Sequence, residues 1–157
     1  MAASPQHAAS SVASFVGTPS HPSQSGKRLG LSAPTLVDLI RSVKAGLPFH
    51  SLETLADDFG LALPQFAVEI GVPSRTLARR KITGKLSPEE SERVLRLAML
   101  YDKTLALFGG NAADAREWLR QPKKALGGET PLAFSATELG AREVENLIGR
   151  LEHGVFS

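Results

Sequence analysis

The sequence predicts an all-α protein, a helical bundle, from two observations. Apolar residues recur every three or four positions in one segment after another, and no segment shows the apolar–polar alternation of a half-buried strand. Residues that cap helices, and glycine or proline residues that end them, separate these segments from one another. A chain of helices joined by short turns follows from the two patterns together.

The composition indicates a globular chain. Of the 157 residues, 42% are apolar and none is cysteine. The lack of cysteine excludes disulfides, thiolate metal sites and a cysteine nucleophile, and it suits a reducing cytoplasm. No apolar run approaches the roughly 20 residues that cross a bilayer, and the first residues lack the basic and apolar regions of a signal peptide. We therefore expect a cytoplasmic protein that does not bind membranes.

Residues 1–32 are expected to form a disordered leader. Small and polar residues dominate this segment, and its few apolar residues are scattered. So few apolar side chains do not offset the entropy that is lost when a chain becomes ordered. Lys27 and Arg28 carry its only positive charges apart from histidine, and we expect them to be solvated rather than to contact phosphates.

Four helices are expected in the next part of the chain. The first ends at Gly46 and Pro48, and the others cover about residues 51–59, 63–70 and 74–81. Gly71 breaks the third helix, and Ser74 is the expected N-cap of the fourth. The apolar residues of the first helix are spaced for a single face: Leu36, Val37, Leu39, Ile40 and Val43.

A long helix is expected to follow. Ser87, Pro88 and Glu90 reproduce a capping box with proline at the first helical position. The apolar residues after it continue at helical spacing as far as Phe108, where a glycine pair stops the helix.

Three capping residues predict the helices of the C-terminal part. Asn111, Thr130 and Thr137 are the expected N-caps, and a glycine turn at residues 126–131 precedes the second of these helices. In the last helix, apolar residues at helical spacing predict a buried stripe, formed by Val144, Leu147, Ile148 and Leu151.

Residues 65–80 have the spacing of a helix-turn-helix. Ala67 is small where the two helices would cross, and Gly71 supplies the left-handed turn between them. Ile70, Val72 and Leu77 are expected to fill the space between the helices. The second helix would then enter the major groove of DNA.

Positive charge is concentrated on that second helix. Five basic residues and no acidic one lie between Ser74 and Lys85, which is the electrostatic footprint expected for DNA binding. Arginine side chains in the major groove typically pair with guanine. For Arg80 we expect instead that the aliphatic stem packs against the fold while the guanidinium reaches a phosphate. The alternative is a basic helix that is simply solvated within a bundle. The predicted DNA-contacting residues are Ser74, Arg75, Thr76, Arg79, Arg80, Lys81 and Lys85.

Several blocks of the sequence are similar to a known family. The blocks are Arg75–Lys81 with Leu86–Ser91, Ala115–Leu119 with Pro122, Leu126–Gly128 with Thr130–Leu132, Gly140–Val144, and Arg150–Val155. On these residues the chain from about Ala33 onward resembles the Xre-type antitoxins of RES-Xre toxin–antitoxin modules. The C-terminal toxin-binding domain of that family is shared with MbcA and ParS antitoxins.

The resemblance implies a Cro/Xre-like helix-turn-helix domain at residues 33–86, followed at residues 87–157 by a long connecting helix and a helical toxin-binding domain. It also implies an antitoxin homodimer that covers the active-site entrance of a RES-domain toxin, an enzyme consuming NAD, and represses its own operon through operator DNA. The chain itself would need no cofactor. The candidate toxin contacts are Arg142, Glu145, Arg150, Glu152, His153, Gly154, Val155, Phe156 and Ser157.

Two other functions are weighed against this one. A solitary Xre-type regulator would use its C-terminal domain to bind some other protein or to dimerise. An enzyme ranks last, because the four histidines lie far apart with no ligand or triad partner at a recognisable spacing. The neighbouring carboxylates Asp57 and Asp58 point in different directions on a helix, and Glu89 with Glu90 belongs to a helix start. We therefore expect no catalytic or metal-binding residue.

Overall fold

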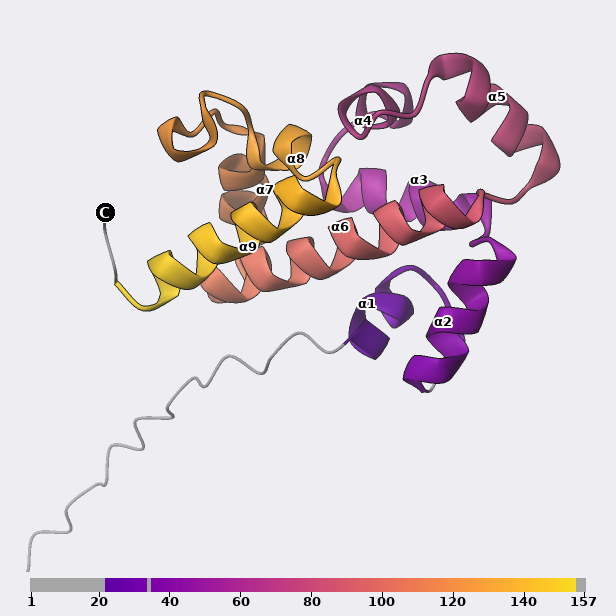
Figure 1. Ribbon diagram of the computed structural model, residues 1–157, viewed down its shortest axis with the longest axis horizontal. Helices are drawn as coiled ribbons and strands as arrows, with labels where there is room; N and C mark the ends of the chain where they lie inside the picture. Colours follow the sequence, from indigo (N-terminus) through magenta and orange to yellow (C-terminus); the bar gives the residue numbers. More distant parts are fainter. Residues whose placement is uncertain (1–21, 34, 155–157) are drawn as a thin grey trace, which may run out of the picture.

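The computed structural model describes residues 22–33 and 35–154, and it confirms the predicted all-α class (Figure 1). Within these residues, the one extended pairing is an isolated antiparallel bridge between Pro48 and Lys85. The helices are α1 (Pro22–Arg28), α2 (Leu36–Ala45), α3 (Phe49–Asp58), α4 (Leu63–Glu69), α5 (Ser74–Thr83), α6 (Pro88–Leu107), α7 (Ala112–Arg120), the 3₁₀ turn η1 (Lys124–Leu126), α8 (Pro131–Phe134) and α9 (Glu138–Glu152).

Helix α6 forms the axis of the fold. It packs against α1, α2 and α3 from the N-terminal part of the chain and against α7 and α9 from the C-terminal part (Figure 1). Its residues Leu97 and Leu100 are completely buried, and one core of apolar side chains extends from Leu29 to Ile148. Because both parts of the chain contribute to one core, α6 fixes the helix-turn-helix relative to the C-terminal helices.

The predicted caps of the later helices are confirmed. The Ser87 hydroxyl accepts a hydrogen bond from the Glu90 amide at 3.1 Å, and the Glu90 carboxylate accepts one from the Ser87 amide at 2.8 Å. Asn111, Thr130 and Thr137 each accept from the amide three residues further on. Each cap satisfies an amide that has no partner within its own helix.

The prediction of a disordered leader is wrong for residues 22–32, whereas residues 1–21 lie outside the described residues. Leu29 is buried in the core, and the Arg28 Nε atom lies 2.6 Å from a carboxylate oxygen of Asp102. Arg28 also lies 3.5 Å from Asp58 and stands over the ring of Tyr101, 4.8 Å from its centroid. Charged and aromatic partners from α3 and α6 therefore add to the sparse apolar contacts of α1.

Arg28 is accordingly a structural residue rather than a solvated one. Burial alone would lower the pKa of its guanidinium, but the carboxylates of Asp102 and Asp58 outweigh that effect and raise the pKa. The side chain therefore stays charged and fastens α1 to the junction of α3 and α6.

The apolar face predicted for α2 is divided in the structure. Leu39 and Val43 are buried, whereas Leu36, Val37 and Ile40 are 50%, 56% and 46% exposed. Part of this exposed side lines a shallow groove between α2, α6 and α9. None of the described helices is both long and apolar enough to span a membrane.

Candidate nucleic-acid interface and partner-binding end

Helices α4 and α5 form the predicted helix-turn-helix. Gly71 has a φ of 75° in the turn between them, in the left-handed region that glycine adopts without strain. The Val72 amide then donates to the Ala67 carbonyl at 2.8 Å. Ala67, Ile70 and Val72 are all buried, as the pattern predicts. Leu77, which was also expected between the helices, is half-buried against the core, so the turn and most of its packing match the expected motif.

Helix α5 presents most of its surface to solvent. It contains no buried residue, and it lies at the outer edge of the molecule, away from the chain's C-terminal end (Figure 1). Arg75, Arg79, Lys81 and Lys85 are exposed, and Thr76 is half-buried. The structure thus brings most of the predicted DNA-contacting residues to one accessible helix and the loop that follows it.

The start of α5 differs from the prediction. Pro73, not Ser74, is the N-cap, and its carbonyl accepts the first helical hydrogen bond from the Leu77 amide at 2.9 Å. The fixed φ of proline suits this extended position, so the helix begins at Ser74 without a side-chain cap. Ser74 is exposed as the first residue of the helix.

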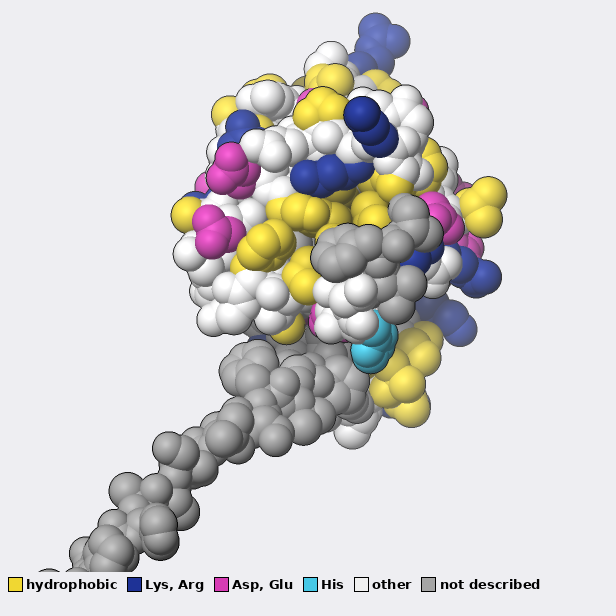
Figure 2. Space-filling view, turned by 90° about the vertical axis from the view of Figure 1, so that its left-hand side faces the viewer, with side chains coloured by type: hydrophobic (Ala, Val, Ile, Leu, Met, Phe, Trp, Pro, Cys, Tyr) yellow, Lys and Arg dark blue, Asp and Glu magenta, His cyan; other side chains and the backbone are white. Residues whose placement is uncertain are grey.

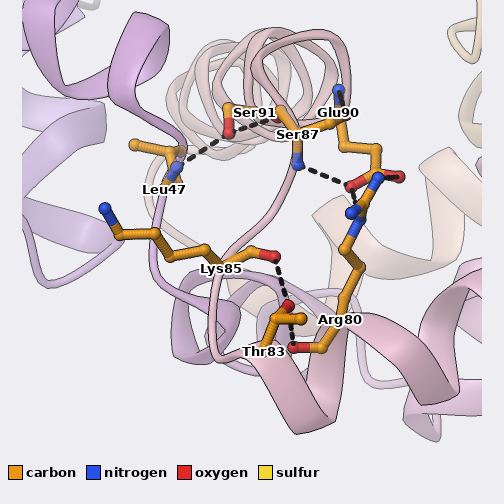
Figure 3. A network of polar contacts seen from close by, with 7 residues as sticks. All are labelled: Leu47, Arg80, Thr83, Lys85, Ser87, Glu90 and Ser91. Atoms are coloured by element: carbon orange, nitrogen blue, oxygen red, sulfur yellow. Dashed lines mark hydrogen bonds and ion pairs between the residues drawn. The ribbon is translucent and has the colours of Figure 1, made fainter.

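Arg80 differs from the other basic residues of α5 (Figure 3). Its Nε and Nη2 atoms donate to the two carboxylate oxygens of Glu90, at 2.8 and 3.2 Å. The Arg80 and Glu90 side chains are only 23% and 13% exposed. Because Glu90 also completes the capping box of α6, this ion pair joins the end of α5 to the start of α6.

The Glu90 carboxylate is held in its charged form. Burial by itself would raise the pKa of this group, but the hydrogen bonds from Arg80 and from the Ser87 amide outweigh burial, so the pKa is lowered. The charge of Arg80 is therefore balanced locally at neutral pH.

The loop between α5 and α6 is tied to the loop before α3. The Phe49 amide donates to the Gly84 carbonyl at 2.9 Å, and the Leu86 amide donates to the Leu47 carbonyl at 2.9 Å. The buried Ser91 hydroxyl accepts from the Leu47 amide at 2.8 Å (Figure 3). These bonds hold the basic loop that contains Lys85 in a fixed position.

The candidate toxin contacts are spread along α9 rather than gathered in one cluster. Arg142 pairs with Glu138 at 2.7 Å, and it is separated from Glu152 by about 15 Å of helix. Glu145 pairs with Lys103 of α6 at 3.0 Å. Arg142 and Glu145 line the groove beside α2 and α6, whereas Arg150 and Glu152 lie at the end of the helix.

The second group of candidates occupies the end of α9. Arg150 lies 3.4 Å from Glu143, and Glu152, His153 and Gly154 are exposed. The remaining candidates, Val155, Phe156 and Ser157, lie outside the described residues.

The apolar residues of the described chain at this end were not among the candidates. Figure 2 shows hydrophobic side chains gathered on the face that includes the C-terminal end, with lysine or arginine side chains beside them. Leu107 and Phe108 at the end of α6, and Leu147 and Leu151 in α9, are all half-buried. The periodicity of α9 predicted full burial of its apolar stripe, but the stripe extends beyond the helices that could cover it.

Two glycines of α9 have different surroundings. A Cβ atom at Gly140 would overlap the Phe134 carbonyl, so glycine allows α8 and α9 to approach closely here. At Gly149 a Cβ atom would meet no atom within 4 Å among the described residues. No neighbouring helix of the described chain therefore requires a glycine at this position.

The described residues contain no group of three or more histidine, aspartate or glutamate side chains arranged to hold a metal ion. His50 pairs with Glu53 at 3.3 Å on the surface of α3, and His153 is the C-cap residue of α9. The described residues present two exposed surfaces, a basic one on α5 and a partly apolar one at the end of α9.

These features define a helix-turn-helix protein with a basic recognition helix and a separate helical C-terminal part. Two family models match the two parts of the chain. The Antitoxin Xre-like helix-turn-helix domain matches residues 38–99, and the Antitoxin Xre/MbcA/ParS C-terminal toxin-binding domain matches residues 104–154.

Relatives match over most of the chain. An Antitoxin Xre of Yersinia enterocolitica is 39% identical over 132 residues, which cover 83% of this chain and 89% of that protein. An Antitoxin Xre of Photorhabdus laumondii is 32% identical, over 90% of this chain and 99% of that protein. A Prs ADP-ribosylating antitoxin of a Sphingobium strain is 28% identical, over 77% of this chain and 82% of that protein. The chain belongs to the Xre antitoxin family.

Proposed function

We propose that the chain neutralises a RES-domain toxin, an enzyme that consumes NAD, by binding over its active site, and that it represses its own operon as a homodimer on operator DNA. The single observation that carries the DNA-binding half is the exposed basic side of α5. Arg75, Arg79 and Lys81 of this helix, and Lys85 of the loop that follows it, are exposed and form no ion pair with a described residue.

Arg80 has a different role within this proposal. Its guanidinium is already bound to Glu90, so a phosphate contact would compete with a bidentate ion pair. We assign Arg80 to holding α5 against α6, and assign DNA contact to Arg75, Arg79 and the two lysines. Two such helices in a homodimer would read half-sites about 34–36 Å apart.

Operator binding is tested by the double variant Arg75→Ala, Arg79→Ala. We expect weaker binding to the DNA upstream of the gene, by roughly 1–3 kcal/mol for each arginine that reads a base, and a smaller dependence on salt. Gel-shift titrations at several salt concentrations measure both quantities.

A matched control removes the same charge elsewhere. Arg120→Ala with Lys124→Ala changes two exposed basic residues of α7 and η1, and it should leave operator affinity nearly unchanged. Equal losses in the two double variants would show that overall charge, rather than α5, governs binding, and would contradict the assignment.

The toxin-binding half rests on the C-terminal match at residues 104–154 and on the exposed end of α9. An inhibitor of this kind needs a preformed surface rather than reactive groups, and α9 packs against α6. The name of the Sphingobium relative refers to ADP-ribosylation, a reaction that uses NAD as donor. That name agrees with an NAD-consuming partner.

Complex formation tests this half. The tagged chain is co-expressed with a RES-type product of the neighbouring gene, and the purified complex is sized. We expect a stable complex with the intact chain and none with a chain that ends at Arg150, although the shortened chain keeps its helical circular dichroism. Absence of a complex with the intact chain would favour a solitary regulator.

A further inference from the structure

An isoleucine lies among the basic residues of the recognition helix. Ile82 is 88% exposed, the highest value among the exposed large apolar side chains of the described residues. It adjoins Lys81, within a helix whose mean hydropathy is low and which carries four basic residues. Neither the packing of the helix-turn-helix nor the Arg80–Glu90 ion pair uses this side chain.

Ile82 lies on the outward face of α5 together with the proposed DNA contacts. In a helix with 3.6 residues per turn, positions 75, 78, 79 and 82 share one face. All four residues on this face, Arg75, Ala78, Arg79 and Ile82, are exposed, whereas Leu77 and Arg80 on the opposite side are half-buried against the fold. An apolar strip formed by Ala78 and Ile82 therefore runs beside two arginines.

The charge around this strip selects the kind of surface that can cover it. An apolar protein surface docking here would remove Arg75, Arg79 and Lys81 from water without neutralising them, which is costly. The major groove of DNA offers phosphates and guanine acceptors for the basic side chains. It also offers one apolar group on a base edge, the 5-methyl group of thymine.

We propose that Ile82, supported by Ala78, contacts the 5-methyl group of thymine in each operator half-site. This specificity contact rests on the proposed DNA binding of α5. The half-site then combines guanine, read by Arg75 or Arg79, with thymine placed toward the C-terminal end of the recognition helix. Ile82 discriminates thymine from cytosine, which has an amino donor and no methyl group in the major groove.

The experiment removes the methyl group and the isoleucine separately. The duplex upstream of the gene is prepared with thymine or with uracil, a base that differs from thymine only by lacking the 5-methyl group. Affinities of the wild-type chain and of Ile82→Ala are measured for both duplexes. Ile82 is exposed and alanine favours helix, so the variant is expected to fold.

The wild-type chain should bind the uracil duplex more weakly, by about fourfold for each thymine methyl group contacted, the ratio that corresponds to burial of one methyl-sized group. Ile82→Ala should bind both duplexes equally, with the affinity of the wild-type chain for the uracil duplex. The matched control is Val68→Ala, which shortens a 71% exposed side chain of α4 and should keep the full thymine preference.

The remaining outcomes overturn the proposal. A wild-type chain that binds the two duplexes equally does not contact thymine methyl groups. An Ile82→Ala chain that keeps the thymine preference assigns Ile82 to another role. If that chain also binds both duplexes more weakly than the wild-type chain by the same factor, the role is one such as contact with a second copy. If the wild-type chain binds neither duplex, both the operator-binding function and this contact are wrong.

Discussion

Glu90 serves two groups at once, because its carboxylate accepts from the Ser87 amide and from the Arg80 guanidinium. We predict that Glu90→Gln lowers the free energy of unfolding by about 1 kcal/mol at neutral pH, since it replaces a charge-assisted pair that is partly exposed with neutral hydrogen bonds. Urea unfolding of both proteins measures the difference.

The pH dependence of that difference follows from the lowered pKa of Glu90. A carboxylate whose pKa is lowered by folding contributes stability above its unfolded pKa, about 4.3 for glutamate, and the contribution is lost as pH falls through the folded value. The gap between the wild-type chain and Glu90→Gln should therefore be constant at neutral pH and close in acid. A gap that widens in acid would contradict the role of the ion pair.

Sequence reasoning succeeded at this scale for most side chains whose partner is local, with the expected cap at Ser74 as the exception. The caps formed by Ser87 and Thr137 bind amides three residues away, so a short pattern determines them. Arg28 pairs with Asp102, 74 residues away, and no local pattern indicates that contact. The sequence predicts a phosphate contact for Arg80 and does not reveal its ion pair with Glu90, because the two side chains meet only when α5 and α6 are packed together.

At the scale of the element, the two glycines of α9 allow a direct comparison, because one is in close contact with α8 and the other is not. We predict that Gly140→Ala lowers the free energy of unfolding by about 1–3 kcal/mol or more, because the added methyl group would overlap the Phe134 carbonyl. Gly149→Ala should instead stabilise the chain, by up to about 1 kcal/mol, because its Cβ enters open space within a helix. Thermal or urea unfolding of the two variants gives both values.

The Gly149→Ala variant also tests whether the toxin contacts α9 at this position. If the toxin approaches the backbone of α9 here, Gly149→Ala will stabilise the free chain and yet weaken the complex. Stabilisation with unchanged complex formation would place the toxin elsewhere on the C-terminal part.

Helix positions followed from the sequence more closely than helix exposure. The long helix was predicted from the capping box at Ser87 to about Phe108, and α6 ends at Leu107. In α2, however, the apolar spacing does not reveal that Leu36, Val37 and Ile40 remain half exposed. Periodicity identifies a face, whereas burial depends on which helices are available to cover it.

At the scale of the whole molecule, the two proposed surfaces lie on different parts of a single core. Helix α5 projects from the part built on α2, α3 and α4, and the end of α9 lies toward the opposite end of α6 (Figure 1). The division at residues 86 and 87 stays a prediction, because α6 packs on helices from both sides of it. Because α5 and the end of α9 lie apart, the residues proposed to bind the operator are different from those proposed to bind the toxin.

The most direct test of the proposed function measures, side by side, NAD consumption by the proposed RES-domain toxin and operator binding by the chain, for one variant of each surface. Arg75→Ala with Arg79→Ala should protect NAD as well as the wild-type chain does, but bind the operator weakly. The chain ending at Arg150 should bind the operator normally and leave NAD consumption uninhibited. If either variant loses both activities while remaining folded, or if the intact chain leaves NAD consumption unchanged, the two-surface account is contradicted.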